Sequence, residues 1–238
     1  MDHQSVDILA FGAHADDVEI GMAGSLTKWA AEGKKIVICD LTEADLSSNG
    51  NVESRRIEAN TAARLLEVIE RVNLYLSDRG LFLTDDHIRK ISNVIRKYRP
   101  KVIFAPYHND RHPDHGNCYH LVKEAFFSAG IRKYEVEDKL PPHKALYLYQ
   151  YMINGFTPPD FVVDITDYID KKVNALQAYE SQFFMNESGV QTPLTEGYIE
   201  SVTARDQLFG KEVGVRFAEG FLSSKPLLLN KNLFGEDL

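Results

Sequence analysis

The sequence has few of the features that mark secreted, membrane or nucleic-acid-binding proteins. It holds only two cysteines, Cys39 and Cys118, without CxxC spacing, so we expect buried thiols and no disulfide framework. No apolar run approaches the roughly 18–20 residues of a membrane span, and the first residues lack the basic stretch of a secretory signal. We therefore expect no membrane partner and a cytoplasmic location.

Positive charge is also scarce. The 27 Lys and Arg against 35 Asp and Glu give a formal charge of −8, which argues against a surface that follows a phosphate backbone, so we expect no nucleic-acid partner. With 238 residues, 44% of them apolar, the chain can bury a full core. Because no repeat or linker-like tract interrupts it, we predict a single domain over residues 1–238.

Short β-branched runs alternate with segments of helical period, an order typical of βαβ units. The predicted strands cover residues 6–11, 35–40, 71–76 and 101–105, and the predicted helices cover 17–31, 53–68 and 85–98. On the second helix we expect Ile57, Ala62, Leu65 and Leu66 to face the core. Past residue 130 the pattern predicts strands at 146–149 and 161–165, helices at 167–183 and 195–209, and a loop at 185–193. The fold class is therefore α/β: a Rossmann-like, doubly wound, mostly parallel sheet with helices on both faces and an irregular C-terminal portion.

The loop after the first strand carries two carboxylates where a dinucleotide-binding protein has a glycine-rich turn. It reads Gly12-Ala13-His14-Ala15-Asp16-Asp17. Ligands bind at the carboxyl ends of parallel strands, and carboxylate and imidazole groups there suit a divalent cation rather than a phosphate. Taken alone, Asp16 or Asp17 could equally cap the following helix.

A second cluster follows the fourth strand. Three imidazoles and two carboxylates lie between His108 and His115, in the run His108-Asn109-Asp110-Arg111-His112-Pro113-Asp114-His115. Strands one and four are plausible neighbours in a doubly wound sheet, so both loops should open on one rim. A shared metal site explains the two clusters better than two unrelated helix caps.

The pair His14-Ala15-Asp16-Asp17 and His112-Pro113-Asp114-His115 resembles the metal-dependent N-acetylglucosaminyl deacetylases of the LmbE/PIG-L type. Four segments closely resemble the bacillithiol-biosynthesis branch of this family: residues 7–22, residues 41–50, Tyr179-Glu180-Ser181-Gln182-Phe183 and residues 192–198. That branch deacetylates N-acetylglucosaminyl malate. Ala15 stands where the wider family usually has Pro, which touches no expected ligand.

This resemblance implies His14, Asp17 and His115 as metal ligands and Asp16 as general base. Two imidazoles and one carboxylate leave open positions for water and substrate, as a catalytic site requires. We expect His112 to donate to the oxyanion, with Asp114 holding its imidazole protonated, although Asp114 could instead cap the helix beginning near His115. Whether Asp16 or His112 protonates the leaving amine stays open.

Two arginines and the strand-two loop are the candidates for binding the substrate. Arg55 and Arg111 could clamp the carboxylates of a malate group, although Arg55 could be a solvated helix charge and Arg111 a partner of Asp110. Ser47 could bind sugar hydroxyls or belong only to a turn. Tyr198 is expected to close over the site.

The expected cofactor is one divalent metal per chain, Zn²⁺ first and Fe²⁺ as the alternative. The expected partner is a small aminosugar substrate, and the resemblance implies a homo-oligomer, often a hexamer. The leading function is hydrolysis of the acetamide of N-acetylglucosaminyl malate. The alternatives are a deacetylase of another N-acetylglucosamine conjugate such as chitobiose, a two-metal phosphoesterase, and a non-catalytic sugar or nucleotide-binding module.

Overall fold

Seven strands form one sheet at the centre of the molecule, in the order β3-β2-β1-β4-β5-β7-β6. The computed structural model describes residues 5–185 and 189–227. The strands are β1 (Ile8–Gly12), β2 (Ile36–Thr42), β3 (Glu70–Leu76), β4 (Val102–Pro106), β5 (Tyr147–Tyr151), β6 (Phe161–Asp164) and β7 (Ala218–Ser223). Strands β1 to β5 are parallel, whereas β7 pairs antiparallel with both β5 and β6. The mostly parallel α/β fold is thus confirmed, and so is the predicted pairing of the first and fourth strands.

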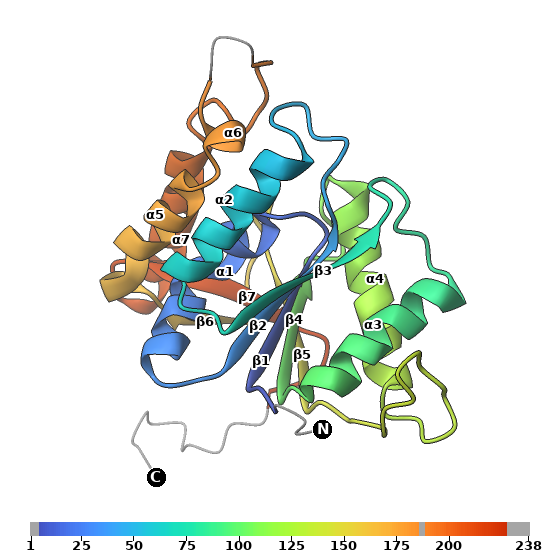
Figure 1. The fold of residues 1–238 in the computed structure, drawn as a ribbon. Helices are drawn as coiled ribbons and strands as arrows, with labels where there is room; N and C mark the ends of the chain where they lie inside the picture. Colours follow the sequence, from blue (N-terminus) through green and yellow to red (C-terminus); the bar gives the residue numbers. More distant parts are fainter. Residues whose placement is uncertain (1–4, 186–188, 228–238) are drawn as a thin grey trace.

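Helices cover both faces of this sheet, as Figure 1 shows. The helices are α1 (Asp17–Ala31), α2 (Val52–Leu65), α3 (Asp85–Tyr98), α4 (Pro113–Ser128), α5 (Ile169–Gln177), α6 (Glu180–Phe183) and α7 (Tyr198–Val213), with a short 3-10 turn at Thr166–Tyr168. Helices α3 and α4 pack together on one face, and α1, α2 and α5 pack on the other. No helix within the described residues is long and apolar enough to cross a membrane.

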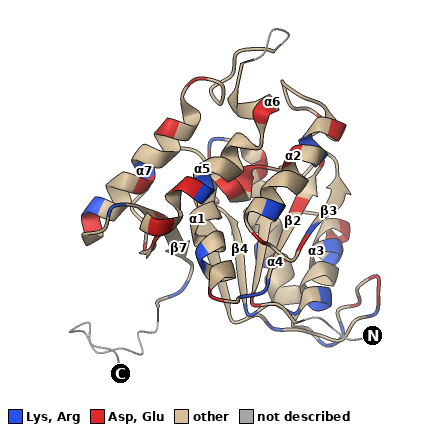
Figure 2. Ribbon diagram, turned by 60° about the vertical axis from the view of Figure 1, so that its left-hand side comes forward, with Lys and Arg blue, Asp and Glu red and all other residues tan. Residues whose placement is uncertain are grey.

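The core has two main parts, one on each side of the sheet. Strand β1 supplies Leu9 and Phe11 to the cluster under α3 and α4, and Ile8 and Ala10 to the cluster under α1 and α2. Successive side chains of a strand point to opposite faces, so a strand buried on both faces reads as a continuous apolar run. Figure 2 shows charged residues along the outer helices, whereas β1 and β4 contain none.

The structure corrects parts of the element prediction. Ile57 and Leu65 are exposed to 57% and 41%, because Ala59, Ala62 and Ala63 form the apolar buried side of α2; Ala62 and Leu66, the residue after the helix, are buried as predicted. The helix predicted at 167–183 is interrupted before α6 at Tyr179, whose φ of −91° and ψ of 62° are not helical. Residues 186–188 of the predicted 185–193 loop lie outside the described residues. Both cysteines are free and buried, as predicted.

Helix α1 approaches β5 closely at a glycine. A Cβ atom at Gly21 would overlap the ring of Tyr151, which is fixed because its hydroxyl donates to the Phe11 carbonyl over 2.7 Å. We expect Gly21→Ala to lower the free energy of unfolding by about 1–3 kcal/mol in urea denaturation. Gly130→Ala is the matched control, since its nearest neighbour would lie 3.5 Å from the new Cβ. Equal losses in the two variants would contradict this packing.

Candidate metal and catalytic site

The loops that follow β1, β2, β3 and β4 enclose a cavity of about 340 Å³ at the carboxyl ends of these strands. This volume is within the usual range for a small-molecule site. Nine of the ten residues singled out in the sequence line it: His14, Asp16, Asp17, Ser47, Arg55, Arg111, His112, His115 and Tyr198. Asp114, the tenth, is fully buried beside the cavity.

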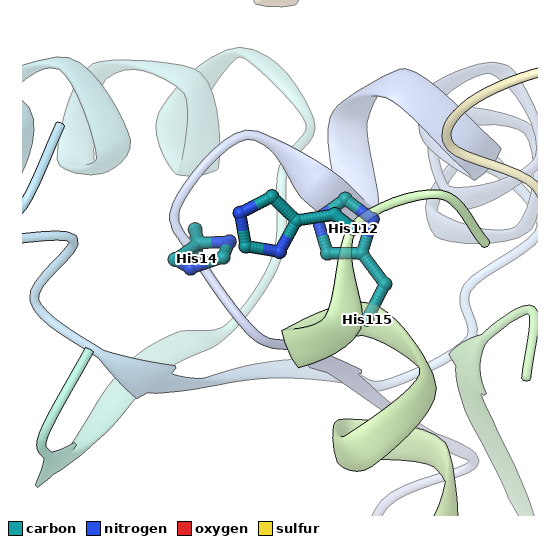
Figure 3. A group of neighbouring side chains, drawn as sticks. All are labelled: His14, His112 and His115. Carbon is teal, nitrogen blue, oxygen red and sulfur yellow. The ribbon is translucent and has the colours of Figure 1, made fainter. Parts of the chain in front are cut away.

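Three imidazoles meet at the centre of this site (Figure 3). His112 and His115 stand at the start of α4, and His14 reaches them from the loop after β1. The His14 ring centroid lies 5.0 Å from that of His112 and 5.6 Å from that of His115. One nitrogen from each ring lies within 4.8 Å of the others, a spacing that could hold a metal ion.

Asp17 links these two loops. Its Oδ2 accepts hydrogen bonds from the backbone N–H groups of Ala13 and His14 over 2.8 and 3.0 Å. Its Oδ1 lies 3.1 Å from Nε2 of His115, and Oδ2 lies 3.7 Å from Nδ1 of His14. Donor atoms around tetrahedral zinc are separated by roughly 3.3–3.6 Å. Asp17 thus lies close to both predicted histidine ligands, but through different oxygens. The donor atoms that lie within 4.8 Å of one another belong to His14, His112 and His115, so the assignment of Asp17 as a ligand stays a prediction.

The far nitrogen of each predicted histidine ligand faces a further carboxylate. Nε2 of His14 lies 3.1 Å from Oδ1 of Asp78, and Nδ1 of His115 lies 3.0 Å from Oδ1 of Asp110. The His14–Asp78 contact is a hydrogen bond of the kind that orients a metal-binding histidine and selects its tautomer. The His115–Asp110 contact is a close approach without hydrogen-bond geometry. This arrangement leaves Nδ1 of His14 and Nε2 of His115 directed toward Asp17.

The acidic surroundings also change the pKa of both imidazoles. Burial favours the neutral rings, but Asp114 and Asp78 outweigh it and raise the pKa of His14 to about 10. In the same way, Asp17 and Asp110 outweigh burial and raise the pKa of His115 to about 9. An environment that favours positive charge this strongly suits a divalent cation.

Asp16 lies beside this cluster without bonding to the predicted ligands. Its Oδ2 is 3.2 Å from a guanidinium nitrogen of Arg55. Burial, reinforced by the charge of Asp17, raises the pKa of Asp16 to about 6 despite the opposing effect of Arg55. A carboxylate with this pKa is ionised at neutral pH and can accept a proton, as a general base must.

The backbone of Asp16 is strained. Its φ of 110° lies in the left-handed region, which a residue with a side chain adopts at a cost of about 1–3 kcal/mol. Asp16 is the residue before α1, yet its side chain caps no N–H group there. The helix-capping alternative for Asp16 is therefore wrong, and the carboxylate is directed to Arg55.

His112 is held differently from the prediction. Its Nδ1 accepts a hydrogen bond from the backbone N–H of Asp114 over 3.3 Å, so His112 caps α4. The Asp114 carboxylate instead binds the backbone N–H and the guanidinium of Arg79. Burial, together with His115 and His14, lowers the pKa of His112. The prediction that Asp114 keeps this ring protonated is thus wrong.

The same hydrogen bond nevertheless leaves His112 able to donate. A neutral imidazole that accepts at Nδ1 carries its proton on Nε2. His112 lines the cavity, so its Nε2–H is available to a substrate oxygen without a charged ring. The predicted oxyanion role of His112 remains a prediction, now with a neutral donor.

Sequence reasoning missed Asp78 and Arg79, which both line the cavity. They follow β3 directly, so the rule that focused attention on the ends of strands one and four could have found them. Oδ2 of Asp78 also accepts the backbone N–H of Leu46 over 3.1 Å. Asp78 thereby connects the loop after β2 to His14.

The two arginines predicted to bind the substrate differ in their surroundings. Arg55 is 2% exposed and bonded to Asp16, so it is neither a solvated charge nor an unoccupied clamp. Arg111 is exposed at the cavity. Asp110 binds Asn154 and the N–H of His112 instead of Arg111. Among the described residues no ion pair involves Arg111.

Ser47 and Tyr198 both line the cavity. The N–H of Ser47 donates to the Ala44 carbonyl within a turn, which leaves both interpretations of Ser47 open. The Tyr198 hydroxyl donates to Ile153 and lies 3.1 Å from Asn154. Tyr198 is therefore part of a fixed cavity wall in this structure.

The fold and the site together define an α/β protein with a candidate metal centre in a cavity at the carboxyl ends of its parallel strands. A family model described as PIG-L, GlcNAc-PI de-N-acetylase, matches residues 9–126, a range that contains both metal-site loops. The chain belongs to this family, and it is an N-deacetylase. The phosphoesterase and non-catalytic alternatives are not retained.

Several known proteins resemble the chain along most of its length. The conserved protein TT1542 from Thermus thermophilus is 36% identical, with a TM-score of 0.86 over 94% of this chain and 97% of that one. Diacetylchitobiose deacetylase from Thermococcus kodakarensis is 29% identical over 90% of this chain and 81% of the relative. A probable N-acetyl-alpha-D-glucosaminyl L-malate deacetylase 2 from Bacillus anthracis is 24% identical over 82% and 89%, respectively.

Proposed function

We propose that the protein hydrolyses the acetamide of N-acetylglucosaminyl malate to give glucosaminyl malate and acetate, a step of bacillithiol biosynthesis. The observation that carries this proposal is Arg111, an exposed guanidinium at the cavity without an acidic partner among the described residues. A protein with a formal charge of −8 needs such a group to hold a dicarboxylate. The resemblance to the malate-handling branch and the Bacillus anthracis relative support the same substrate.

The chain's own residues have separate roles in this reaction. His14, Asp17 and His115 would hold one divalent cation, Zn²⁺ or Fe²⁺, which when bound polarises the amide carbonyl and makes water more acidic. Asp16 removes the proton of the attacking water. His112 donates its Nε2–H to the oxygen that becomes negatively charged. Arg111 binds a malate carboxylate and thereby places the acetamide between these groups.

A second candidate is deacetylation of a chitobiose-like disaccharide. The relative from Thermococcus kodakarensis favours it, because its identity of 29% extends over 90% of this chain. A disaccharide carries no carboxylate, so Arg111 would have no charged partner in its complex. The two candidates therefore differ in what they require of Arg111.

Comparative kinetics test the proposal. The assay measures acetate release from N-acetylglucosaminyl malate, N,N'-diacetylchitobiose and free N-acetylglucosamine in the presence of Zn²⁺, with mass detection of the amine product. We expect the highest kcat/KM for the malate conjugate. Arg111→Ala should lower that value about 10- to 100-fold, mainly through KM, because a charge-assisted hydrogen bond to the substrate is lost. The variant should leave diacetylchitobiose hydrolysis unchanged.

Arg132→Ala, which removes an exposed arginine outside the cavity, is the matched control and should match the unmodified protein. A higher kcat/KM for diacetylchitobiose than for the malate conjugate would establish the second candidate. If Arg111→Ala left KM for the malate conjugate unchanged, Arg111 would not be the residue that binds the malate carboxylate.

The quaternary structure and the cellular location belong to the same proposal. The resemblance to the family supports a homo-oligomer, a hexamer in particular. A cytoplasmic location is proposed from the sequence, which has no apolar run of membrane-spanning length and no basic stretch at its start. Sedimentation of the purified chain measures the first of these directly.

A further inference from the structure

Arg55 makes two contacts on consecutive residues of the loop that carries the predicted general base. One guanidinium nitrogen lies 3.2 Å from Oδ2 of Asp16, and the other donates to the carbonyl of Ala15. The Arg55 side chain is only 3% exposed. A planar guanidinium that binds two acceptors in this way fixes both position and orientation.

Asp16 depends on this contact for its geometry. Among the described residues, Arg55 is the only hydrogen-bond donor to the Asp16 carboxylate. The left-handed backbone of Asp16 persists only where surrounding groups hold it. The contact with the Ala15 carbonyl restrains the same loop one residue earlier.

Arg55 is itself supported from behind by a buried network. Its guanidinium lies over the ring of Tyr179, 5.6 Å from the centroid. The Tyr179 hydroxyl donates to Oε1 of Glu19 over 3.0 Å, and the same oxygen lies 2.5 Å from Arg71. Arg71 also binds both carboxylate oxygens of Asp40. A side chain fixed by packing and hydrogen bonds on this scale can position a catalytic group.

We propose that Arg55 is a positioning residue, which holds the Asp16 carboxylate and the Ala15 carbonyl in place for base catalysis and does not bind the substrate's anionic group. The inference rests on the proposed function for the identity of the base. It replaces the clamp expected from the sequence, and it leaves Arg111 as the arginine that contacts the aglycone. In this proposal, the first turns of α2 serve to place Arg55 against Ala15 and Asp16 of the loop after β1.

Substrate charge separates the two roles of Arg55. A positioning residue affects the chemical step on every substrate, so Arg55→Ala should lower kcat about 100-fold on both N-acetylglucosaminyl malate and diacetylchitobiose, with KM within about twofold. Arg55→Lys retains one donor to Asp16 and should lose only about tenfold. If Arg55→Ala raised KM for the malate conjugate alone and left kcat unchanged, the proposal would be overturned, and Arg55 would be a residue that binds the malate carboxylates.

Arg56→Ala is the matched control. Arg56 is adjacent on α2, its side chain is 64% exposed, and within the described residues its one ion pair is with Glu53, so its replacement should leave both kinetic constants unchanged. If Arg55→Ala does not fold, Arg55→Lys decides between the two roles by the same comparison of kcat and KM.

Crystal structures of the unmodified protein and Arg55→Lys test the inference without an activity. In the unmodified protein we expect Asp16 to keep its left-handed backbone and its contact with Arg55. In Arg55→Lys we expect the contact between residue 55 and the Ala15 carbonyl to be lost and the Asp16 carboxylate to shift. If the unmodified enzyme turns over no N-acetylglucosaminide, the proposed function fails, and these structures still judge the positioning role. An Asp16 geometry that is the same in both would contradict it.

Discussion

Asp16→Asn should lower kcat for acetamide hydrolysis by about 10³-fold while the protein keeps one metal ion per chain. General-base catalysis contributes typically about 10²–10⁴-fold, and an amide cannot accept the proton of water. Asparagine retains the oxygen to which Arg55 donates, so the loop should keep its conformation. Steady-state kinetics and elemental analysis of the same sample measure the two quantities together.

The control for this substitution is Asp45→Asn. Asp45 is an exposed carboxylate of the loop after β2 that does not line the cavity, and its replacement should leave kcat unchanged. If Asp16→Asn retained a tenth or more of the activity with its metal bound, Asp16 would not be the general base. If it lost the metal, Asp16 would be a ligand and the division of roles between Asp16 and Asp17 would be wrong.

His115→Ala should lower the metal content from one ion per chain to less than about a tenth and abolish measurable hydrolysis. The imidazole of His115 lies between Asp17 and Asp110, so its loss removes one of the three predicted ligands and the ring that faces Oδ1 of Asp17. Losing a ligand of a catalytic metal removes both the binding and the chemistry that the ion supplies. The metal content of the variant and of the unmodified protein is measured after dialysis of both against the same concentration of Zn²⁺.

His120→Ala is the matched control, because His120 is on the same helix, is exposed and does not line the cavity. It should bind one ion and retain full activity. Removing the metal from the unmodified enzyme with a chelator should reproduce the inactivity of His115→Ala, and adding Zn²⁺ should reverse it. A His115→Ala variant that still binds one ion per chain would contradict the ligand assignment.

The sequence predicts strands β1 to β5 and the helices α1 to α3 in about the right places, although the predicted core face of α2 is partly wrong because Ile57 and Leu65 are exposed. Helices α1 (Asp17–Ala31) and α3 (Asp85–Tyr98) occupy the predicted residues. Strand β7 (Ala218–Ser223) was missed, since Ala-Glu-Gly-Phe-Leu-Ser contains no β-branched residue and includes a charged one. That charged residue, Glu219, is completely buried and binds Lys172 over 2.8 Å. A strand stabilised by a distant partner has no local signal.

The site was predictable to the extent that its residues directly follow strands. His14, Asp17, His112 and His115 were identified because two dense clusters end neighbouring strands, and the cavity contains them all. The contact of Arg55 with Asp16 spans 39 residues, and it depends on how the start of α2 packs against the loop after β1. Period and spacing describe single elements, so they do not reveal such a contact.

The central claim is that the loops after β1 and β4 bind one cation together and that Asp16 does not coordinate it. Anomalous diffraction from crystals grown with Zn²⁺ tests this claim most directly. We expect one ion per chain at about 2.0–2.2 Å from an imidazole nitrogen of His14, an oxygen of Asp17 and an imidazole nitrogen of His115. Asp16 should remain on Arg55. An ion held by His14, His112 and His115 without Asp17, or one coordinated by Asp16, would contradict it.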